Sequence, residues 1–213
     1  MIRKEIDVVA LGELLIDFAP LGKSENSMPM YECNPGGAPA NVLTVCSRMG
    51  LKAAFVGKVG EDMFGAFLKE TLEKENIDTN GLVIDKDCFT TLAFVALSEN
   101  GERSFSFARK PGADTRLDKS ELNRKVLENC KVLHVGSLSL TDEPARSATF
   151  QAIHIAKSAG ALISYDPNYR APLWQSKEKA VEAMKSVLPY VDFMKASEEE
   201  AILLTGEKSE LDA

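Results

Sequence analysis

The sequence predicts an α/β fold with a doubly wound, mostly parallel sheet flanked by helices. Apolar runs of strand length alternate along the chain with longer segments of helical pattern, as in repeated strand–helix–strand units. Runs such as VLHVG (132–136) and ALISYD (161–166) are largely apolar, which is typical of strands covered by helices on both faces. With 213 residues, 45% of them hydrophobic, the chain has enough apolar material for one sizeable core.

The expected elements follow this alternation in chain order. The strands of the main sheet are expected at Ile6–Leu11, Ala53–Gly57, Val132–Val135, Ala161–Asp166 and Val191–Lys195. Helices are expected from about Pro39, Asp62, Asp142 and Lys177. The third helix should end at Ser158, because Gly160 follows it and glycine is a usual helix terminator.

Two segments break the alternation and predict a small β-sheet lid. Leu14–Phe18 with Tyr31–Cys33, and the region Leu82–Arg109, have strand patterns with no helix between them. The turn Glu99-Asn100-Gly101 predicts a hairpin in the second segment. We expect the two insertions to pair as a lid that projects from the α/β core. The alternative is a plain antiparallel edge of the main sheet.

Composition limits the partners of the chain. The net charge of -7 argues against nucleic acid or an anionic membrane as partner, because both attract basic surfaces. No apolar stretch has the length of a membrane span, and the N-terminus lacks a signal-peptide core. The four cysteines form no CxxC pair, which fits a reduced cytoplasm with most of them as small core residues.

The most informative motif covers residues 34–65, NPGGAPANVLTVCSRMGLKAAFVGKVGEDMFG. Gly36 and Gly37 allow a sharp turn and a close approach of a ligand to the backbone. The helix that follows directs free N–H groups at that ligand, and Asn41 adds an amide suited to sugar hydroxyls. In order and spacing, this run resembles the N-terminal signature of the ribokinase-like (PfkB) carbohydrate kinases.

The resemblance implies a sugar site. By this resemblance, Asp17 in GELLIDF binds sugar hydroxyls, and Gly36, Gly37 and Asn41 form a second wall. Taken alone, an Asp at a strand end is more often a turn or cap residue, and a Gly-Gly turn often only precedes a helix.

The sequences around Arg109 (FSFARKPGAD) and Arg170 (DPNYR) resemble those of fructokinases and 2-keto-3-deoxygluconate kinases, in which arginines at these positions face the substrate. The alternative for each is a surface salt bridge. Phe107 is expected either as the apolar wall of the sugar site or as lid core.

The segment 195–206 predicts a strand end, a helix N-cap and a helix. Ser197 fits the cap, and Glu200 three residues later completes a capping box, which is a sufficient structural explanation. The family has an Asn-x-x-Glu motif here, and Ser197 replaces its Asn. The resemblance therefore implies that Lys195, Ser197 and Glu200 contact MgATP, with Glu200 holding Mg²⁺ through water.

The expected domain is one ribokinase-like kinase domain, of which residues 1–213 form the N-terminal part. Its α/β core is expected at about 1–12, 34–81 and 112–213, and its lid at about 13–33 and 82–111. The family's Gly-Ala-Gly-Asp run, which supplies the base Asp, does not occur in this sequence. We therefore expect the catalytic Asp beyond Ala213, the C-terminal nucleotide-binding part to be absent, and the 213-residue chain alone to be inactive.

The function implied by the resemblance is ATP-dependent phosphorylation of a sugar, with fructose to fructose 6-phosphate preferred. One alternative is 2-keto-3-deoxygluconate kinase, and another is a non-catalytic protein that binds a sugar or a protein partner. A dinucleotide-binding domain is disfavoured because no GxGxxG follows the first strand. By analogy with the family, the lid is expected to pair two copies of the chain into a homodimer.

Overall fold

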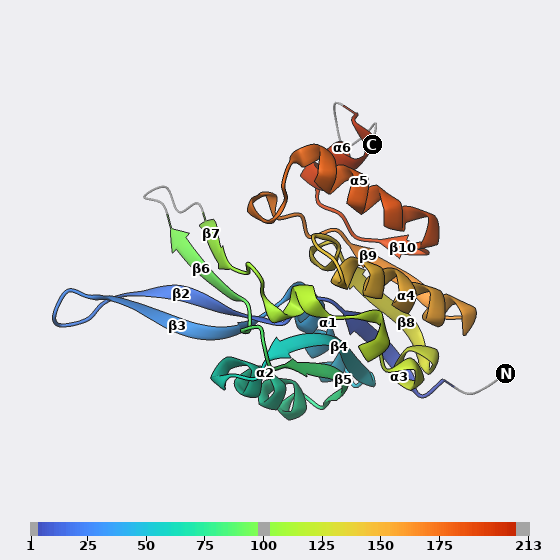
Figure 1. The fold of residues 1–213 in the computed structure, drawn as a ribbon, viewed down its shortest axis with the longest axis horizontal. Helices are drawn as coiled ribbons and strands as arrows, with labels where there is room; N and C mark the ends of the chain where they lie inside the picture. Colours follow the sequence, from blue (N-terminus) through green and yellow to red (C-terminus); the bar gives the residue numbers. More distant parts are fainter. Residues whose placement is uncertain (1–3, 98–102, 208–213) are drawn as a thin grey trace.

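The computed structural model describes residues 4–97 and 103–207, which contain a six-stranded sheet of order β10-β9-β8-β1-β4-β5 (Figure 1). Its strands are β1 (Ile6–Leu11), β4 (Ala53–Gly60), β5 (Ile77–Asp85), β8 (Cys130–Gly136), β9 (Leu162–Asp166) and β10 (Phe193–Met194). Every neighbouring pair is parallel. The chain moves outward from β1 first through β4 and β5 and then through β8, β9 and β10. The predicted doubly wound arrangement is confirmed.

Helices cover both faces of this sheet. Their bounds are α1 (Ala38–Arg48), α2 (Met63–Lys74), α3 (Arg124–Glu128), α4 (Ala145–Ser158), α5 (Lys177–Val187) and α6 (Glu198–Thr205). Val9 and Leu11 of β1 pack with side chains of α3 and α4, whereas Ala10 packs with those of α1 and α2. Helices α5 and α6 pack on each other beside the β10 end. Among the described residues, no helix combines the length and apolar character needed to cross a bilayer.

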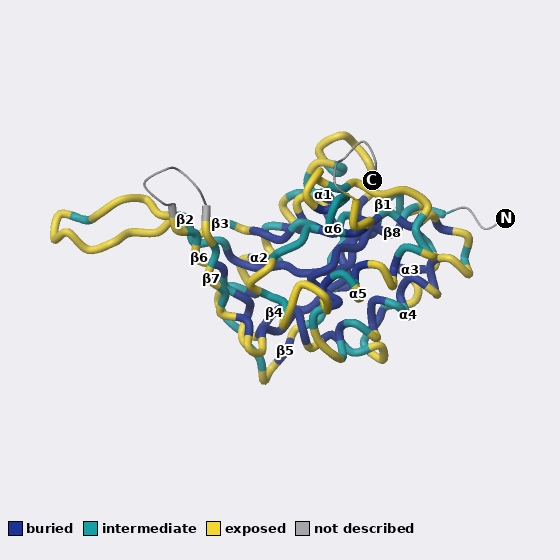
Figure 2. Tube along the Cα trace, turned by 90° about the horizontal axis from the view of Figure 1, so that it is seen from above, coloured by how far each residue is buried: buried dark blue, intermediate teal, exposed yellow. Residues whose placement is uncertain are grey.

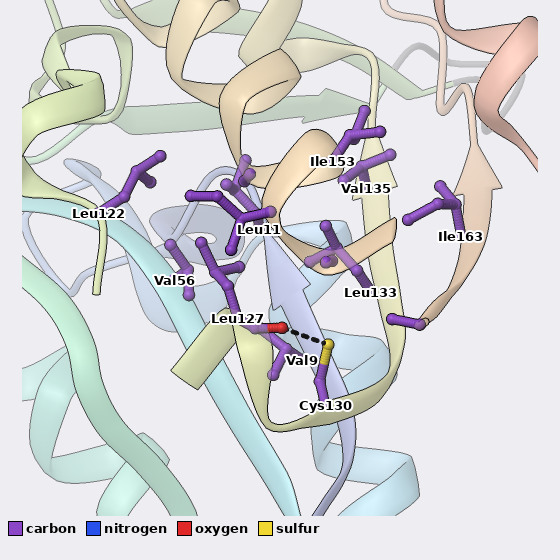
Figure 3. Close-up of a cluster of buried hydrophobic side chains, with 14 of the residues drawn as sticks. Val9, Leu11, Val56, Leu122, Leu127, Cys130, Leu133, Val135, Ile153 and Ile163 are labelled. Carbon is purple, nitrogen blue, oxygen red and sulfur yellow. Dashed lines mark hydrogen bonds between the residues drawn. The ribbon is translucent and has the colours of Figure 1, made fainter. Parts of the chain in front are cut away.

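The larger apolar cluster lies between the sheet and the α3–α4 layer (Figure 3). Leu133, Ile153 and Ile163 in this cluster are fully buried, and Cys130 donates a hydrogen bond from its thiol to the Leu127 carbonyl at 3.2 Å. The expectation that most cysteines are core residues is wrong. Cys130 is buried, but Cys33 is exposed and the other two are partly exposed, because they lie on a lid strand, a helix surface and a loop.

The predicted lid is a second sheet of order β3-β2-β6-β7, which projects from the body of the molecule (Figure 1). It consists of β2 (Leu15–Lys23), β3 (Pro29–Gly36), β6 (Leu92–Leu97) and β7 (Arg103–Ala108). β2 pairs with β3 and β6 with β7 in antiparallel fashion, whereas β2 and β6 are parallel. The alternative of an edge of the main sheet is therefore wrong. The predicted turn at 99–101 lies outside the described residues.

Burial distinguishes the two sheets. Buried residues run through the centre of the main sheet, whereas the outer part of the β2–β3 hairpin is exposed (Figure 2). The second segment of the lid begins later than the expected residue 82, because residues 82–85 belong to β5. Leu82 pairs with Gly57 and Asp85 with Gly60, so this strand extends the main sheet up to the point where the lid leaves it. The last strand of the main sheet is shorter than the expected Val191–Lys195.

A buried carboxylate stabilises the segment between β1 and β2, where the chain first passes from the core into the lid. Glu13, which follows β1, is 2% exposed, and its Oε1 accepts a hydrogen bond from the Ala38 N–H at the start of α1 at 3.0 Å. Its Oε2 is buried without a hydrogen-bond partner among the described residues. Removal from water raises the pKa of Glu13 from its ordinary value of 4.5 to about 7. The segment that enters the lid after β1 is thereby tied to the start of α1, where the chain returns to the core.

A buried ion pair stabilises the segment after β7, where the chain returns from the lid to the core for the second time. Arg109, directly after β7, pairs with Asp114, and its Nε lies 2.7 Å from the Asp114 Oδ2. The other Asp114 oxygen accepts a hydrogen bond from the Thr91 hydroxyl, just before β6. The Arg109 guanidinium also donates to the Thr141 hydroxyl and to the Leu138 carbonyl of the core. Both ends of the β6–β7 hairpin are thus fastened to the main body.

We expect Asp114→Ala to lower the free energy of unfolding by about 3–5 kcal/mol, because it leaves the Arg109 guanidinium buried without its charge partner. Denaturant unfolding of the purified protein measures this change. Glu128→Ala is the matched control, because it breaks the exposed Arg124–Glu128 pair and should change stability little. Equal effects of the two substitutions would contradict the structural role assigned to the buried pair.

The raised pKa of Glu13 predicts how stability depends on pH. Between pH 4.5 and about 7 the unfolded chain has released the Glu13 proton while the folded chain retains it, so stability falls as pH rises. In Glu13→Gln this contribution is absent. The stability of the variant minus that of the wild type should therefore increase over this interval, by about 3 kcal/mol in total. Urea unfolding at several pH values measures the difference, and Glu199→Gln at an exposed position should show no such trend.

Candidate functional site

The sheet topology places the candidate site between the lid and the carboxyl ends of the central strands. In open α/β sheets, ligands bind beyond the carboxyl ends of strands where the direction of winding changes. Here that point lies at β1 and β8, because the chain reaches β4 on one side of β1 and β8 on the other. The chain enters the lid from the carboxyl end of β1, so the lid stands beside the carboxyl ends of the central strands (Figure 1).

Asp17 lies on the lid strand β2, with its side chain on the same face as an aromatic residue of β7. In the strand register Asp17 is opposite Ala93 of β6, and Ala93 is opposite Phe107 of β7. Residues directly opposite one another in a sheet have their side chains on the same face. Asp17 and Phe107, both partly buried, therefore share one face of the lid.

The Gly36-Gly37 turn lies directly against Asp17. A Cβ at Gly36 would come within 2.3 Å of the Asp17 Oδ2, so no larger residue fits beside this carboxylate. Gly37 has a φ of 113° and is packed against the backbone of Glu13, which again requires glycine. Helix α1 begins immediately afterwards. Its first turn carries Asn41. The side chain of Asn41 is exposed, and its backbone N–H donates to the Gly37 carbonyl.

Arg170, in the loop after β9, brings a positive charge to the same place. Partial burial raises the pKa of the Asp17 carboxyl, and the nearby Arg170 guanidinium opposes that rise. The guanidinium lies over the Phe105 ring, 5.8 Å from its centroid, and donates to the Tyr169 carbonyl. Phe105 in turn stacks on Phe107, with ring centroids 6.1 Å apart. The lid and the loop after β9 thus meet through an arginine and two aromatic rings.

Arg109 does not join this group. It was expected to face the substrate or to form a surface salt bridge, but it is 6% exposed and its guanidinium donates to Asp114, Thr141 and Leu138 inside the protein. The reason is the approach of the core at this point, which provides a buried carboxylate and a carbonyl for the arginine donors. In this structure Arg109 fastens the lid.

The start of α6 holds the three residues expected to contact a nucleotide. Ser197 and Glu200 form the predicted capping box, in which the Ser197 Oγ accepts from the Glu200 N–H at 3.2 Å and the Glu200 Oε2 accepts from the Ser197 N–H at 2.8 Å. The Glu200 Oε1 accepts a further hydrogen bond from the Tyr169 N–H at 2.7 Å. Lys195 is exposed and pairs with Asp166 at the end of β9, at 3.2 Å.

Sequence reasoning missed two residues of this region. Phe105 is two positions before Phe107 in one strand, so the alternation of side chains would have placed both on the same face. Glu13 follows the apolar run of β1 directly, and a carboxylate at that position was a signal for a buried, paired group. Neither residue belongs to the glycine-rich motif at 34–65, on which the prediction of the sugar site mainly rested.

The arrangement suits a small polar molecule with several hydroxyl groups. Asp17 offers hydrogen-bond acceptors, Arg170 offers donors, and the rings of Phe105 and Phe107 offer an apolar surface. The expected free N–H groups at the start of α1 are largely missing, because the Ala38 N–H donates to Glu13 and Pro39 has none. Within residues 4–97 and 103–207, no cluster of three or more His, Cys, Asp or Glu side chains has the geometry of a metal site.

Known proteins resemble the chain over most of its length. A probable fructokinase-7 of Arabidopsis thaliana is 47% identical over 201 residues, which cover 93% of this chain and 59% of the relative. The chain thus spans about three fifths of the length of this curated relative. A crystal structure of fructokinase from Vibrio cholerae O395, in a form with fructose, ADP and calcium ion bound, is 37% identical with a TM-score of 0.86. It is matched over 97% of this chain and 65% of that chain.

A crystal structure of fructokinase with bound ATP from Xylella fastidiosa has a TM-score of 0.84 at 34% identity, over 95% of this chain and 61% of that chain. These similarities confirm the predicted ribokinase-like fold with its small separate sheet. The family described as pfkB family carbohydrate kinase matches residues 5–213. Since this match covers nearly the whole sequence, the chain belongs to the pfkB family of carbohydrate kinases.

Proposed function

We propose that the complete protein carrying this sequence transfers a phosphoryl group from ATP to the primary hydroxyl of fructose, giving fructose 6-phosphate. The observation that carries this proposal is the meeting of Asp17, the Gly36-Gly37 turn and Arg170 at the carboxyl ends of the central strands. The similarity to fructokinases supports it, including one whose structure is described with fructose and ADP bound. The activity belongs to the complete protein, because the chain spans 59% of its Arabidopsis relative.

Each residue of the group has a distinct role in this proposal. The Asp17 carboxylate accepts hydrogen bonds from two neighbouring hydroxyls, and Gly36 leaves room for the sugar beside it. The exposed Asn41 side chain contacts hydroxyls on the opposite side. Arg170 donates to sugar oxygens, while Phe107 covers the apolar face of the ring and limits access of water. Exclusion of water protects ATP from hydrolysis.

The start of α6 fits MgATP. Glu200 supplies carboxylate oxygens, which are the ligands that Mg²⁺ prefers, and both oxygens retain a lone pair after accepting one N–H each. Mg²⁺ held through water at Glu200 would neutralise negative charge on the phosphates. Ser197 contributes the helix cap that orients Glu200, and the exposed Lys195 lies where it can approach a phosphate.

We expect Asp17→Asn to lower kcat/KM for fructose about 100-fold, because the amide loses the charge and one of the two acceptor oxygens. The measurement is a coupled assay for ADP release with the complete protein. Glu25→Gln at the exposed tip of the lid is the control and should leave kcat/KM unchanged. The same assay with 2-keto-3-deoxygluconate tests the alternative substrate. A higher kcat/KM for the ketoacid, or no phosphorylation of either compound, would overturn the proposal.

We further propose that the lid pairs two copies of the protein through its other face. Phe18, opposite both Cys33 and Phe94 in the strand register, points away from the Asp17 face. The rings of Phe18 and Phe94 stack at 5.0 Å, and Tyr31 meets Phe94 edge to face at 6.2 Å. Phe94 and Tyr31 are 37% and 46% exposed. An exposed aromatic face of this kind suits a contact between identical subunits.

Phe94→Asp should convert this dimer into a monomer, because it places a charge in the centre of the aromatic face. Sedimentation velocity measures the mass of the complete protein. Leu162→Asp is the control. Leu162 is 51% exposed at the start of β9, which is the end of the parallel sheet opposite to the lid, and the substitution should not change the mass. A wild-type protein that sediments as a monomer at micromolar concentration would refute the proposed pairing.

The proposed location is the cytoplasm, where ATP is available as a substrate. All four cysteines are free thiols in the structure, and Cys33 on the lid is exposed. Exposed thiols persist in a reducing compartment. This supports the location that the cysteine pattern predicts.

A further inference from the structure

Glu200 makes one more hydrogen bond than a helix cap requires. In a capping box, the carboxylate returns one bond to the N–H of the cap residue, which here is the 2.8 Å contact with Ser197. The Glu200 side chain is 7% exposed, and its other oxygen accepts the Tyr169 N–H at 2.7 Å. Tyr169 belongs to the loop after β9, so this second bond joins two segments that are far apart in the sequence. Capping of α6 does not explain it.

The peptide held by Glu200 leads directly to the candidate sugar site. Arg170 is the next residue, and its guanidinium folds back to donate to the Tyr169 carbonyl at 3.0 Å. The same guanidinium covers the Phe105 ring of the lid. It also lies close enough to Asp17 to influence its carboxylate. The position of the Tyr169 backbone therefore sets the position of the only arginine that the described residues bring to Asp17 and the lid aromatics.

Few other polar contacts fix this loop to α6. β10 and β9 pair at Phe193 with Ser164 and at Met194 with Tyr165, and the Lys195 N–H donates to the Tyr165 carbonyl at 3.0 Å, four residues before Tyr169. The pair between Lys195 and Asp166 involves a side chain that is 72% exposed, so it constrains the loop weakly.

The first residues of the loop are held by other bonds. The Pro167 carbonyl accepts the Ser137 N–H at 3.2 Å, and Asn168, with a φ of 43°, donates its N–H to the Asp166 Oδ1 at 3.1 Å. The Glu200 carboxylate holds the next residue, Tyr169. The loop is not held by this contact alone, since Tyr169 also packs on the apolar cluster of Ala180, Met184 and Leu204 between α5 and α6. Removal of the carboxylate should therefore disturb the loop without unfolding the helices.

We propose that Glu200 is a positioning residue of the sugar site, which holds the Tyr169–Arg170 backbone so that the guanidinium can bind the sugar. This inference rests on the proposed function. It differs from a role in metal binding, because a residue that acts only through Mg²⁺ does not affect sugar affinity when metal and nucleotide are absent. The start of α6 is then mechanically connected to the sugar, and the two substrate sites share one side chain.

The test is calorimetric titration of the complete protein with fructose in buffer containing EDTA and no nucleotide. We expect Glu200→Ala to raise the Kd about tenfold, because a charged acceptor of the loop is lost. Glu200→Gln keeps an acceptor for only one N–H and should give an intermediate Kd. The matched control is Glu199→Ala, at the exposed neighbouring position on α6, with an unchanged Kd. A Kd for Glu200→Ala within twofold of the wild type would overturn the inference.

Amide hydrogen exchange provides a readout that does not need sugar. The peptide covering residues 167–173 should exchange faster in Glu200→Ala than in the wild type, while peptides from β1 should be unchanged and so show that the protein is folded. Unchanged exchange in the loop would also overturn the inference. If the wild type binds neither fructose nor 2-keto-3-deoxygluconate, the proposed function fails, and the exchange rates still decide whether Glu200 holds the loop.

Discussion

The buried pairing of Arg109 with Asp114 is the contact on which the geometry of the site depends. It fixes the end of β7 to the core, and Asp114 also receives the Thr91 hydroxyl from the start of β6. Since β6 pairs with β2, this anchoring also helps to hold the lid strand that carries Asp17. A buried charge pair contributes less to net stability than a well-packed apolar contact of similar size. Its value here is the unique position that it gives to the lid.

In the proposed function, the two faces of the lid have different tasks. Asp17 and Phe107 lie on the face assigned to the sugar, whereas Phe18 and Phe94 lie on the other. In a sheet covered on both sides, these residues would be core. Here Phe18 packs edge to face on Phe64 of α2, with ring centroids 5.8 Å apart, whereas Phe94 beside it stays 37% exposed. Two hairpin insertions into an α/β core thus create both surfaces.

Local sequence patterns were sufficient for the elements but not for the long-range contacts. The bounds of β1 and the end of α4 agree with prediction, because apolar runs and Gly160 act within a few residues. Arg109 was misplaced because its burial depends on Leu138 and Thr141, which approach it only in the folded chain. The start of the lid was misplaced for the same reason. Whether residues 82–85 belong to core or lid depends on which strand they pair with, and both environments favour the same β-forming side chains.

The central position of β1 imposes an order on the assembly of the chain. Ile6 pairs with Cys130, and Ile16 in the lid pairs with Leu92, so the first strands made receive their last neighbours only after much of the chain has been synthesised. Contacts between such distant segments close slowly because the intervening loops must first be ordered. Until then β1 exposes an unpaired apolar edge, to which a second nascent chain can bind. A central first strand therefore keeps its edges open longer than a strand that pairs only with its neighbours in sequence.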